Sequence, residues 1–499
     1  MKRLNIIVLV IIIVSFFFTG CIKEKEVNLV KEDSNNVVIG VDKLPETLDI
    51  NSNLSVRDYD IFCALFDGLV ELKENGEVVG ALAEKYEVSN DGLEYIFYLR
   101  DNLYWSNGTE INSDDFITFF KEILSPNNKG VEDLYSIYGV KDYNEGKSSF
   151  EKNVSIMKVD DKTLKIRMNN KDDNFIYTLA KPKYRLRKIN KTLENYKLDF
   201  NNLITTGAFT ISNVDENEIQ LIKRNNYYEK EYSNIRNITI KSTGTEEIAL
   251  VSLLMEEVDI LFDIPISESE NMLEKNKLDI TPLSIVKLIE FNKNKDKEVN
   301  DINLRLAIEQ SIIWEISTLD LVKNFKGEMS YGAFKRKSEN GAAKVTINKM
   351  ADYEGERQKA KNKAKDIIKS IDYKGNPLTL LALDTLENKQ ISDFIAKSLK
   401  NISGINVKIN LCSEEEFKEL IIQNKYDMVL RDYNYEEHNY YDTLNLSDIK
   451  NNKDNLIKDK YLISLYFKNL LTCRSKKVGY LSYYGDGILK LKDIIINED

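Results

Sequence analysis

The clearest local signal near the start of the chain is a pair of strand patterns joined by a turn. Residues 84–88 lead into Asn90-Asp91-Gly92, and residues 93–100 then alternate apolar and polar side chains. An Asp-Gly pair between such segments is a strong hairpin signal, and a period of two is typical of a strand with one buried face. A helix should follow from Asn112 or Ser113, because either residue can cap it and acidic residues occupy the first turn.

A regular alternation of strands and helices occupies the last quarter of the chain. The apolar pattern predicts, in order, a strand at 378–383, a helix at 391–402 closed by Gly404, a strand at 405–411, a helix at 414–423 and a strand at 426–430. This β-α-β-α-β order requires parallel strands with right-handed crossovers. Ligands of such open sheets bind beyond the carboxyl ends of the strands. The residues that leave the third strand, Arg431, Asp432, Tyr433 and Asn434, are therefore candidates for a ligand site.

The N-terminus has the pattern of a secretory signal. Basic residues precede an apolar run at 4–18, which is short for a membrane-spanning helix of about 20 residues. The run ends in Phe18-Thr19-Gly20-Cys21, which resembles a bacterial lipobox although Phe18 replaces the usual leucine. We expect acylation of Cys21, since two or three acyl chains give durable membrane attachment. A chance cysteine after an ordinary signal and a plain transmembrane anchor are the alternatives. The polar residues 21–36 are then a flexible tether.

Composition narrows the classes of function. The net charge of −11 argues against non-specific nucleic-acid binding, which needs a basic face. His438 is the only histidine, which argues against a histidine-rich metal site and against Ser–His or Cys–His catalysis. The cysteines other than Cys21 are Cys63, Cys412 and Cys473, an odd and widely spaced set that is not a disulfide framework. We therefore expect no enzyme, no cofactor and no metal site.

Ordered motif blocks extend over nearly the whole expected mature chain. They are Leu65–Val70, Ala83–Tyr86, Asp91-Gly92, Phe97–Arg100, Trp105–Gly108, Asp114–Phe116, Leu124–Pro126, Thr206–Phe209, Arg224–Tyr228, Val258–Ile260, Leu304–Ile308, Gly404–Val407 and Tyr426–Met428. In this order they resemble the peptide- and nickel-binding family of solute receptors for ABC importers, and within it the oligopeptide-binding proteins. No single block is decisive, and the resemblance rests on their order.

The resemblance implies a fold, a domain plan and a function. The fold is an α/β, two-lobed periplasmic-binding-protein-like clamp with mixed sheets, whose lobes are joined by crossing strands. The plan is a lipoprotein signal peptide at 1–20, a tether at 21–36, a first lobe at 37–285 with an inserted subdomain at about 58–185, a second lobe at 286–465 containing the unit 377–430, and a return to the first lobe at 466–499. The function is capture of oligopeptides at the outer face of the bacterial cytoplasmic membrane and delivery to a permease and its ATPase. We expect a lipid-anchored monomer without a cofactor or nucleic-acid partner.

The resemblance also implies roles for individual residues. Asp432, followed by Tyr433, takes the position of the family aspartate that holds the free ammonium group of a peptide, while the neighbouring backbone pairs with the peptide as an added strand. Arg431 is a candidate partner for a peptide carboxylate. Tyr135 and Tyr138 match a region where family tyrosines face the cleft, with core or surface packing as the alternative for both. The alternative for Asp432 is an exposed loop acid or a helix cap.

The chain also departs from the family pattern. It lacks the tryptophan usually found near the aspartate, and only residues 455–460 bridge to the last strands where a longer helical stretch is usual. This trimming leaves open a relative that has lost transport and serves as a peptide-signal receptor or chaperone. A lipoprotein enzyme such as a peptidase is a further class, without a convincing nucleophile–base pair. Nickel and haem are alternative ligands, although a single histidine argues against nickel ligation.

Overall fold

The computed structural model describes residues 35–52, 54–73, 76–126, 128–229, 233–294, 296–331, 333, 353–371, 373–434, 455–484 and 486–497. The expected signal peptide, Cys21 and the tether as far as residue 34 lie outside these residues. From Val37 onward the chain forms one compact unit.

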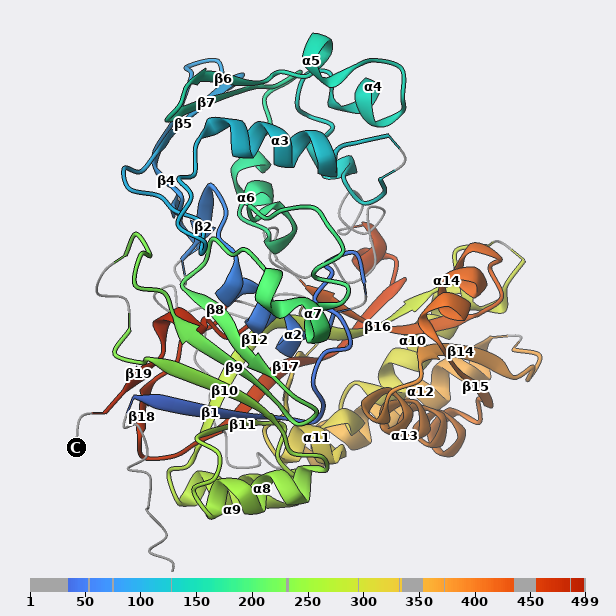
Figure 1. The fold of residues 1–499 in the computed structure, drawn as a ribbon. Helices are drawn as coiled ribbons and strands as arrows, with labels where there is room; N and C mark the ends of the chain where they lie inside the picture. The colour runs from blue at the N-terminus through green and yellow to red at the C-terminus, as the bar shows by residue number, and fades with distance from the viewer. Residues whose placement is uncertain are drawn as a thin grey trace, which may run out of the picture. The chain divides into compact units, whose positions relative to one another are not determined.

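A long mixed sheet is the frame of this unit (Figure 1). Its strands lie in the order β15 (Val407–Cys412), β14 (Leu378–Leu383), β16 (Met428–Asn434), β12 (Leu278–Phe291), β17 (Leu462–Arg474), β11 (Ile260–Phe262), β1 (Asn36–Val41), β10 (Asn237–Ser242), β9 (Glu218–Lys223) and β8 (Phe209–Val214). β13 (Gly327–Met329) pairs with β17 beside this path. The long strands β12 and β17 are antiparallel partners, and they join the part of the sheet that ends in β15 to the part that ends in β8.

One end of this sheet is a β-α-β-α-β unit made by β14, α13 (Leu386–Ser403), β15, α14 (Glu414–Ile422) and β16. β14 pairs in parallel with both β15 and β16, as the sequence pattern predicts. α13 and α10 (Ile302–Ile312) pack on the face where Leu380 and Leu430 are buried, whereas α14 packs on the face of Leu381 and Val429. Because both faces are covered, the strands are apolar at successive positions.

β16 extends further than its sequence pattern predicts. The pattern places a strand at 426–430 with Arg431 to Asn434 beyond it, whereas the strand spans Met428–Asn434. The cause is the neighbouring strand β12, which pairs with β16 without a break from Phe291↔Met428 to Ile285↔Asn434. The prediction that Arg431 and Asp432 lie beyond the end of the strand is therefore wrong.

A second sheet has the order β4 (Ala83–Val88), β5 (Glu94–Leu99), β7 (Thr163–Arg167) and β6 (Ile156–Asp160). β4 and β5 form the predicted hairpin, and Gly92 supplies the positive φ of 71° in the turn between them. α3 (Ser113–Ile123) starts at the predicted cap, because Asn112 accepts a hydrogen bond from the backbone N–H of Asp114. Trp105 is 1% exposed and lies in the core of this part of the chain.

The remaining helices and strands connect and cover these two sheets (Figure 1). They are α2 (Val56–Leu65), β2 (Val70–Leu72), β3 (Val78–Gly80), α4 (Val140–Asn144), α5 (Phe150–Asn153), α6 (Phe175–Leu179), α7 (Tyr196–Asp199), α8 (Glu246–Leu254), α9 (Ser269–Glu274), α11 (Asp320–Lys323), α12 (Glu354–Ser370), β18 (Val478–Tyr480) and β19 (Ile495–Ile496). Within the described ranges, no helix is long and apolar enough to cross a membrane. The domain boundaries expected from the sequence stay a prediction.

Candidate ligand-binding site

Asp432 lies inside β16 and directly opposite Lys287 of the neighbouring strand β12. The same register places Arg431 opposite Leu288 and Tyr433 opposite Val286. Successive side chains of a strand point to opposite faces of the sheet. Asp432 therefore shares a face with Lys287, while Arg431 and Tyr433 lie on the other face.

Asp432 lies together with three other charged side chains, and we call the four the paired-charge cluster: Lys287, Glu387, Asp432 and Lys468. The ammonium of Lys287 lies 2.7 Å from Asp432 Oδ1, and that of Lys468 lies 3.3 Å from Asp432 Oδ2. Lys468 also contacts Glu387 Oε2 at 2.9 Å. Glu387 Oε1 accepts a hydrogen bond of 2.7 Å from the hydroxyl of Tyr466. The cluster thus brings together strands β12, β16 and β17 and the first turn of α13, with its positive and negative charges balanced.

The members of the cluster differ in their access to solvent. The side chain of Lys287 is 2% exposed, and its ammonium also donates to Asn388 Oδ1 at 3.0 Å. The side chains of Asp432 and Lys468 are 27% and 21% exposed. Lys287 is therefore a fixed internal partner, whereas Asp432 and Lys468 reach the surface.

Electrostatic pairing keeps Glu387 and Lys468 ionised. Burial alone would raise the pKa of Glu387, but the charges of Lys287 and Lys468 outweigh it and hold that pKa below its usual range. Burial would likewise lower the pKa of Lys468, but Asp432 and Glu387 raise it above the ordinary value for lysine. Charges taken out of water are tolerated when they are paired and hydrogen-bonded.

Arg431 and Tyr433 belong to different surroundings from Asp432. Arg431 Nη2 lies 3.2 Å from Glu290 Oε2, and both side chains are largely buried. Tyr433 is buried in an apolar cluster with Val286 and Leu288. The structure therefore does not bring Arg431 and Asp432 together on one face, and their shared role in holding a ligand stays a prediction.

Tyr135 and Tyr138 lie in the part of the chain that carries the second sheet. The hydroxyl of Tyr135 donates to Asn144 Oδ1 at 2.8 Å, and its ring packs against the core of that part. Tyr138 is 51% exposed, and its backbone N–H donates to the carbonyl of Arg167. The packing of Tyr135 agrees with the alternative prediction for this residue, which is packing in the core or at the surface. Contact of either tyrosine with a ligand stays a prediction.

Sequence reasoning missed Lys287, Glu387 and Lys468. A weak signal exists for Lys287, because it interrupts the apolar run of β12 between Val286 and Leu288. A charged residue at a buried position of a strand requires a partner. The identity of that partner depends on the order of strands in the sheet, which the local pattern does not contain.

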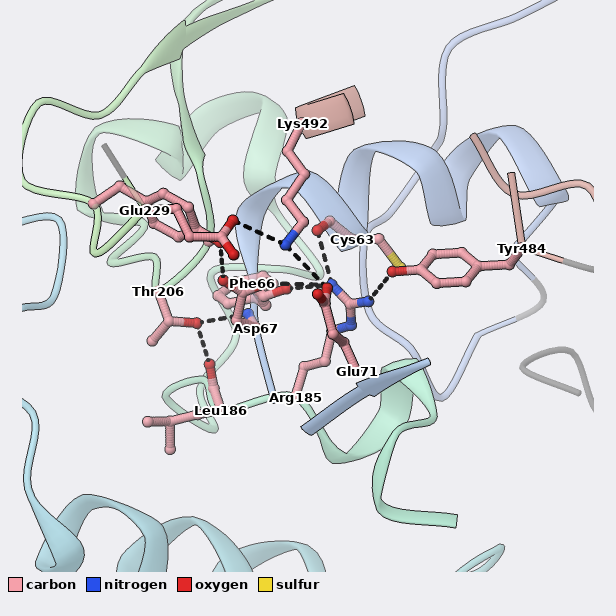
Figure 2. A network of polar contacts seen from close by, with 12 residues as sticks. Cys63, Phe66, Asp67, Glu71, Arg185, Leu186, Thr206, Glu229, Tyr484 and Lys492 are labelled. Carbon is pink, nitrogen blue, oxygen red and sulfur yellow. Dashed lines mark hydrogen bonds and ion pairs between the residues drawn. The ribbon is translucent and has the colours of Figure 1, made fainter. Parts of the chain in front are cut away.

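Motif residues that carry the family resemblance meet in a second polar cluster (Figure 2). The backbone N–H of Asp67 donates to Thr206 Oγ1 at 3.0 Å, and this hydroxyl donates to the carbonyl of Leu186 at 2.9 Å. Tyr227 donates to Asp67 Oδ2 at 2.6 Å. Beside Thr206, Gly207 has no room for a side chain, because a Cβ there would lie 2.4 Å from a backbone oxygen of the α2 helix.

Arg185 connects further segments of the chain to the same cluster. It donates to the carbonyls of Phe66 and Cys63 at 2.7 and 2.9 Å and to the hydroxyl of Tyr484 at 2.9 Å. Its guanidinium lies 3.6 Å from the carboxylate of Asp67. These contacts join segments that are hundreds of residues apart in the sequence.

Lys492 extends this cluster to the C-terminal segment. Figure 2 shows its ammonium between the carboxylates of Glu71 and Glu229. The ammonium lies 2.9 Å from Glu71 Oε2 and 3.3 Å from Glu229 Oε2. Burial alone would raise the pKa of Glu71, but the charges of Lys492 and Lys73 outweigh burial and hold that pKa at about 2. The motifs around Asp67 and Thr206 therefore fix the internal packing of the chain.

The described residues contain no group of three or more His, Cys, Asp or Glu side chains suited to hold a metal ion. The cysteines within these residues, Cys63, Cys412 and Cys473, are free thiols. Cys63 is partly buried and the other two are buried.

The sequence matches known binding proteins over most of its length. The model of the family "Bacterial extracellular solute-binding proteins, family 5 Middle" matches residues 77–455. The oligopeptide-binding protein OppA of Bacillus subtilis is 29% identical over 50% of this chain and 47% of its own length. The periplasmic oligopeptide-binding protein OppA of Salmonella typhimurium is 24% identical over 82% of this chain and 76% of its own length. The match thus spans about half the length of the first of these relatives.

The fold matches solved structures more completely. OppA of Haemophilus influenzae in complex with RPPGFSPFR superposes with a TM-score of 0.69, covering 93% of this chain and 99% of that one at 16% sequence identity. This likeness confirms the predicted fold class, the mixed α/β fold of two-lobed binding proteins. The relatives are solute-binding proteins and not enzymes. With three quarters of its residues matched by the family model, the chain belongs to family 5 of the bacterial extracellular solute-binding proteins.

Proposed function

We propose that this protein is the substrate-binding lipoprotein of an ABC importer, which captures oligopeptides outside the cell and delivers them to a membrane permease and its ATPase. Two of its relatives are named oligopeptide-binding proteins, and OppA of Haemophilus influenzae, which has the same fold, was solved in complex with a nine-residue peptide. These names support a peptide as the ligand. The alternative of a receptor or chaperone that has lost transport rests on the trimmed C-terminal lobe alone, and these names do not favour it.

The position of Asp432 is the observation on which the peptide proposal rests. Its carboxylate is held by the ammonium of buried Lys287 at 2.7 Å, yet 27% of the Asp432 side chain is exposed. A carboxylate held in this way is ready to accept a charge-assisted hydrogen bond from the free ammonium of a peptide. The backbone of the peptide would then pair with neighbouring protein backbone as an added extended segment. Such main-chain hydrogen bonds give affinity that does not depend on the sequence of the peptide.

Arg431 and Tyr433, which we also propose as ligand contacts, can reach a ligand only if their present surroundings change. Arg431 has to leave Glu290, 3.2 Å away, to take a peptide carboxylate. Tyr433 has to contribute from a buried position, whereas Tyr138 is exposed and available for stacking. Tyr135, whose hydroxyl donates to Asn144, is proposed as a further ligand contact. The protein is proposed to act as a monomer.

Membrane attachment through Cys21 is part of the same proposal. Two or three acyl chains would hold the protein durably at the outer face of the cytoplasmic membrane. Cys21→Ser should release the protein into the soluble fraction or leave it uncleaved. Full recovery of the cleaved Ser variant in membranes would contradict lipid anchoring.

Identification of the natural ligand tests the peptide proposal. The protein is purified without denaturation, the bound material is released with acid, and mass spectrometry identifies it. We expect a mixture of short peptides with free amino termini that bind again to the stripped protein in calorimetry. Recovery of a non-peptide solute that binds again, with no binding of peptides, would refute the proposal.

A further inference from the structure

The two lysines that contact Asp432 are not equivalent. Lys287 is almost fully buried, approaches Asp432 Oδ1 at 2.7 Å and is anchored to Asn388. Lys468 approaches Asp432 Oδ2 at the longer distance of 3.3 Å, and 21% of its side chain is exposed. Of the two lysines, Lys468 therefore has the greater access to solvent, and it makes the longer of the two contacts with Asp432.

Lys468 also has a second carboxylate within reach. Its ammonium lies 2.9 Å from Glu387 Oε2, closer than to Asp432. Glu387 is fixed in turn by the hydroxyl of Tyr466 and by its place in the first turn of α13, where Thr385 caps the helix. If Asp432 passes to another cation, Lys468 keeps Glu387 as its ion-pair partner.

We propose that Lys468 competes with the ammonium group of the ligand for Asp432 and is a specificity-determining residue of the peptide site. This inference rests on the proposed role of Asp432. An arriving ammonium takes the place of Lys468 at Asp432 Oδ2, and Lys468 moves fully onto Glu387. Lys468 thereby reduces the affinity that a peptide gains from a free amino terminus. Glu387 lowers the free energy needed to displace Lys468 from Asp432, because it remains as the partner of Lys468.

The substitution Lys468→Met tests the competition, because methionine keeps most of the length of the side chain and removes the charge. Calorimetry compares tetra-alanine with N-acetyl-tetra-alanine, which lacks the ammonium. We expect Lys468→Met to raise the ratio of the two affinities by about fivefold, which corresponds to about 1 kcal/mol at 1.4 kcal/mol per decade. The gain should come from tighter binding of the free-amine peptide.

The matched control is Lys476→Met, which removes the same charge from an exposed position after the end of β17. It should leave the ratio at its wild-type value. Measurements at 0.15 and 0.5 M salt separate contact from long-range attraction, because the Debye length falls from about 8 Å to roughly half of that. The effect of Lys468→Met should persist at the higher salt concentration.

A second substitution acts in the opposite direction. Glu387→Gln leaves Lys468 with Asp432 as its carboxylate partner, so the affinity for tetra-alanine should fall while that for the acetylated peptide changes little. This variant also decides the outcome if Lys468→Met does not fold, as judged by circular dichroism. An unchanged ratio in Lys468→Met, or tighter binding of tetra-alanine by Glu387→Gln, would overturn the competition.

Asp432→Asn separates failure of this inference from failure of the proposed function. If Asp432→Asn weakens binding of tetra-alanine but Lys468→Met leaves the ratio unchanged, Asp432 is the anchor and Lys468 does not compete. If Asp432→Asn binds tetra-alanine as the wild type does, or the wild type binds no peptide, the proposed function itself fails at this site.

Discussion

The buried ammonium of Lys287 gives the sharpest prediction for stability. Lys287→Met removes the positive charge that lies 2.7 Å from Asp432 and keeps most of the side-chain volume. Removing one partner of a buried ion pair costs about 3–5 kcal/mol, because the remaining charge is left without compensation. Asp432 is partly exposed and keeps Lys468, so we expect a loss at the lower end, about 3 kcal/mol.

Urea unfolding, followed by circular dichroism and by tryptophan fluorescence, measures this loss as a shift of the midpoint at constant slope. The control is Lys85→Met, which removes a lysine 2.8 Å from Glu87 in a pair that is more than half exposed on both sides. That variant should unfold at the wild-type midpoint, because solvent screens an exposed pair.

The double variant Lys287→Met with Asp432→Asn completes the cycle. Its loss should be smaller than the sum of the two single losses, because each single change removes the same pair. If Lys287→Met unfolds within about 1 kcal/mol of the wild type, below the cost of a broken buried pair, the buried-pair reasoning is wrong.

Two further predictions concern the cluster of Figure 2. Gly207→Ala should destabilise the protein by about 1–3 kcal/mol in the same urea assay, because its Cβ meets backbone atoms of α2, whereas Gly355→Ala, with nothing within 4 Å, should not. Glu71 has its pKa lowered from 4.5 to about 2 by Lys492 and Lys73 against the opposing effect of burial, so its contribution to stability is complete above about pH 4.5 and is lost as the pH falls toward 2. Urea midpoints between pH 6 and pH 3 should therefore fall less in Glu71→Gln than in the wild type, and equal falls would contradict the pairing.

Local sequence patterns predicted those parts of the fold that local interactions determine. The hairpin at Asn90-Asp91-Gly92 and the cap at Asn112 each depend on a few neighbouring residues, and both are present. The unit from β14 to β16 was predictable for a related reason, since its strands are buried on both faces and read as apolar runs.

Long-range pairing explains what the patterns missed. The last residues of β16 are polar, so the sequence suggests that the strand ends at 430, but β12 supplies partners as far as Asn434. That extension puts Arg431 and Asp432 on opposite faces, which their adjacency in the sequence conceals. The contacts of Asp432 with Lys287 and Lys468 join residues more than thirty positions apart, and only the order of strands brings them together.

The central claim is that Asp432 binds the free ammonium group of a peptide. A double-mutant cycle, with one change in the protein and one in the ligand, tests it most directly. Calorimetry measures wild type and Asp432→Asn with tetra-alanine and with N-acetyl-tetra-alanine. Loss of either partner of a buried charge pair costs roughly 2–5 kcal/mol, so each change alone should weaken binding about 30- to 5000-fold. Both changes together should cost less than their sum, because each removes the same contact. Binding of tetra-alanine by a folded Asp432→Asn within about threefold of wild type, well under the decade that 1.4 kcal/mol represents, would contradict the account.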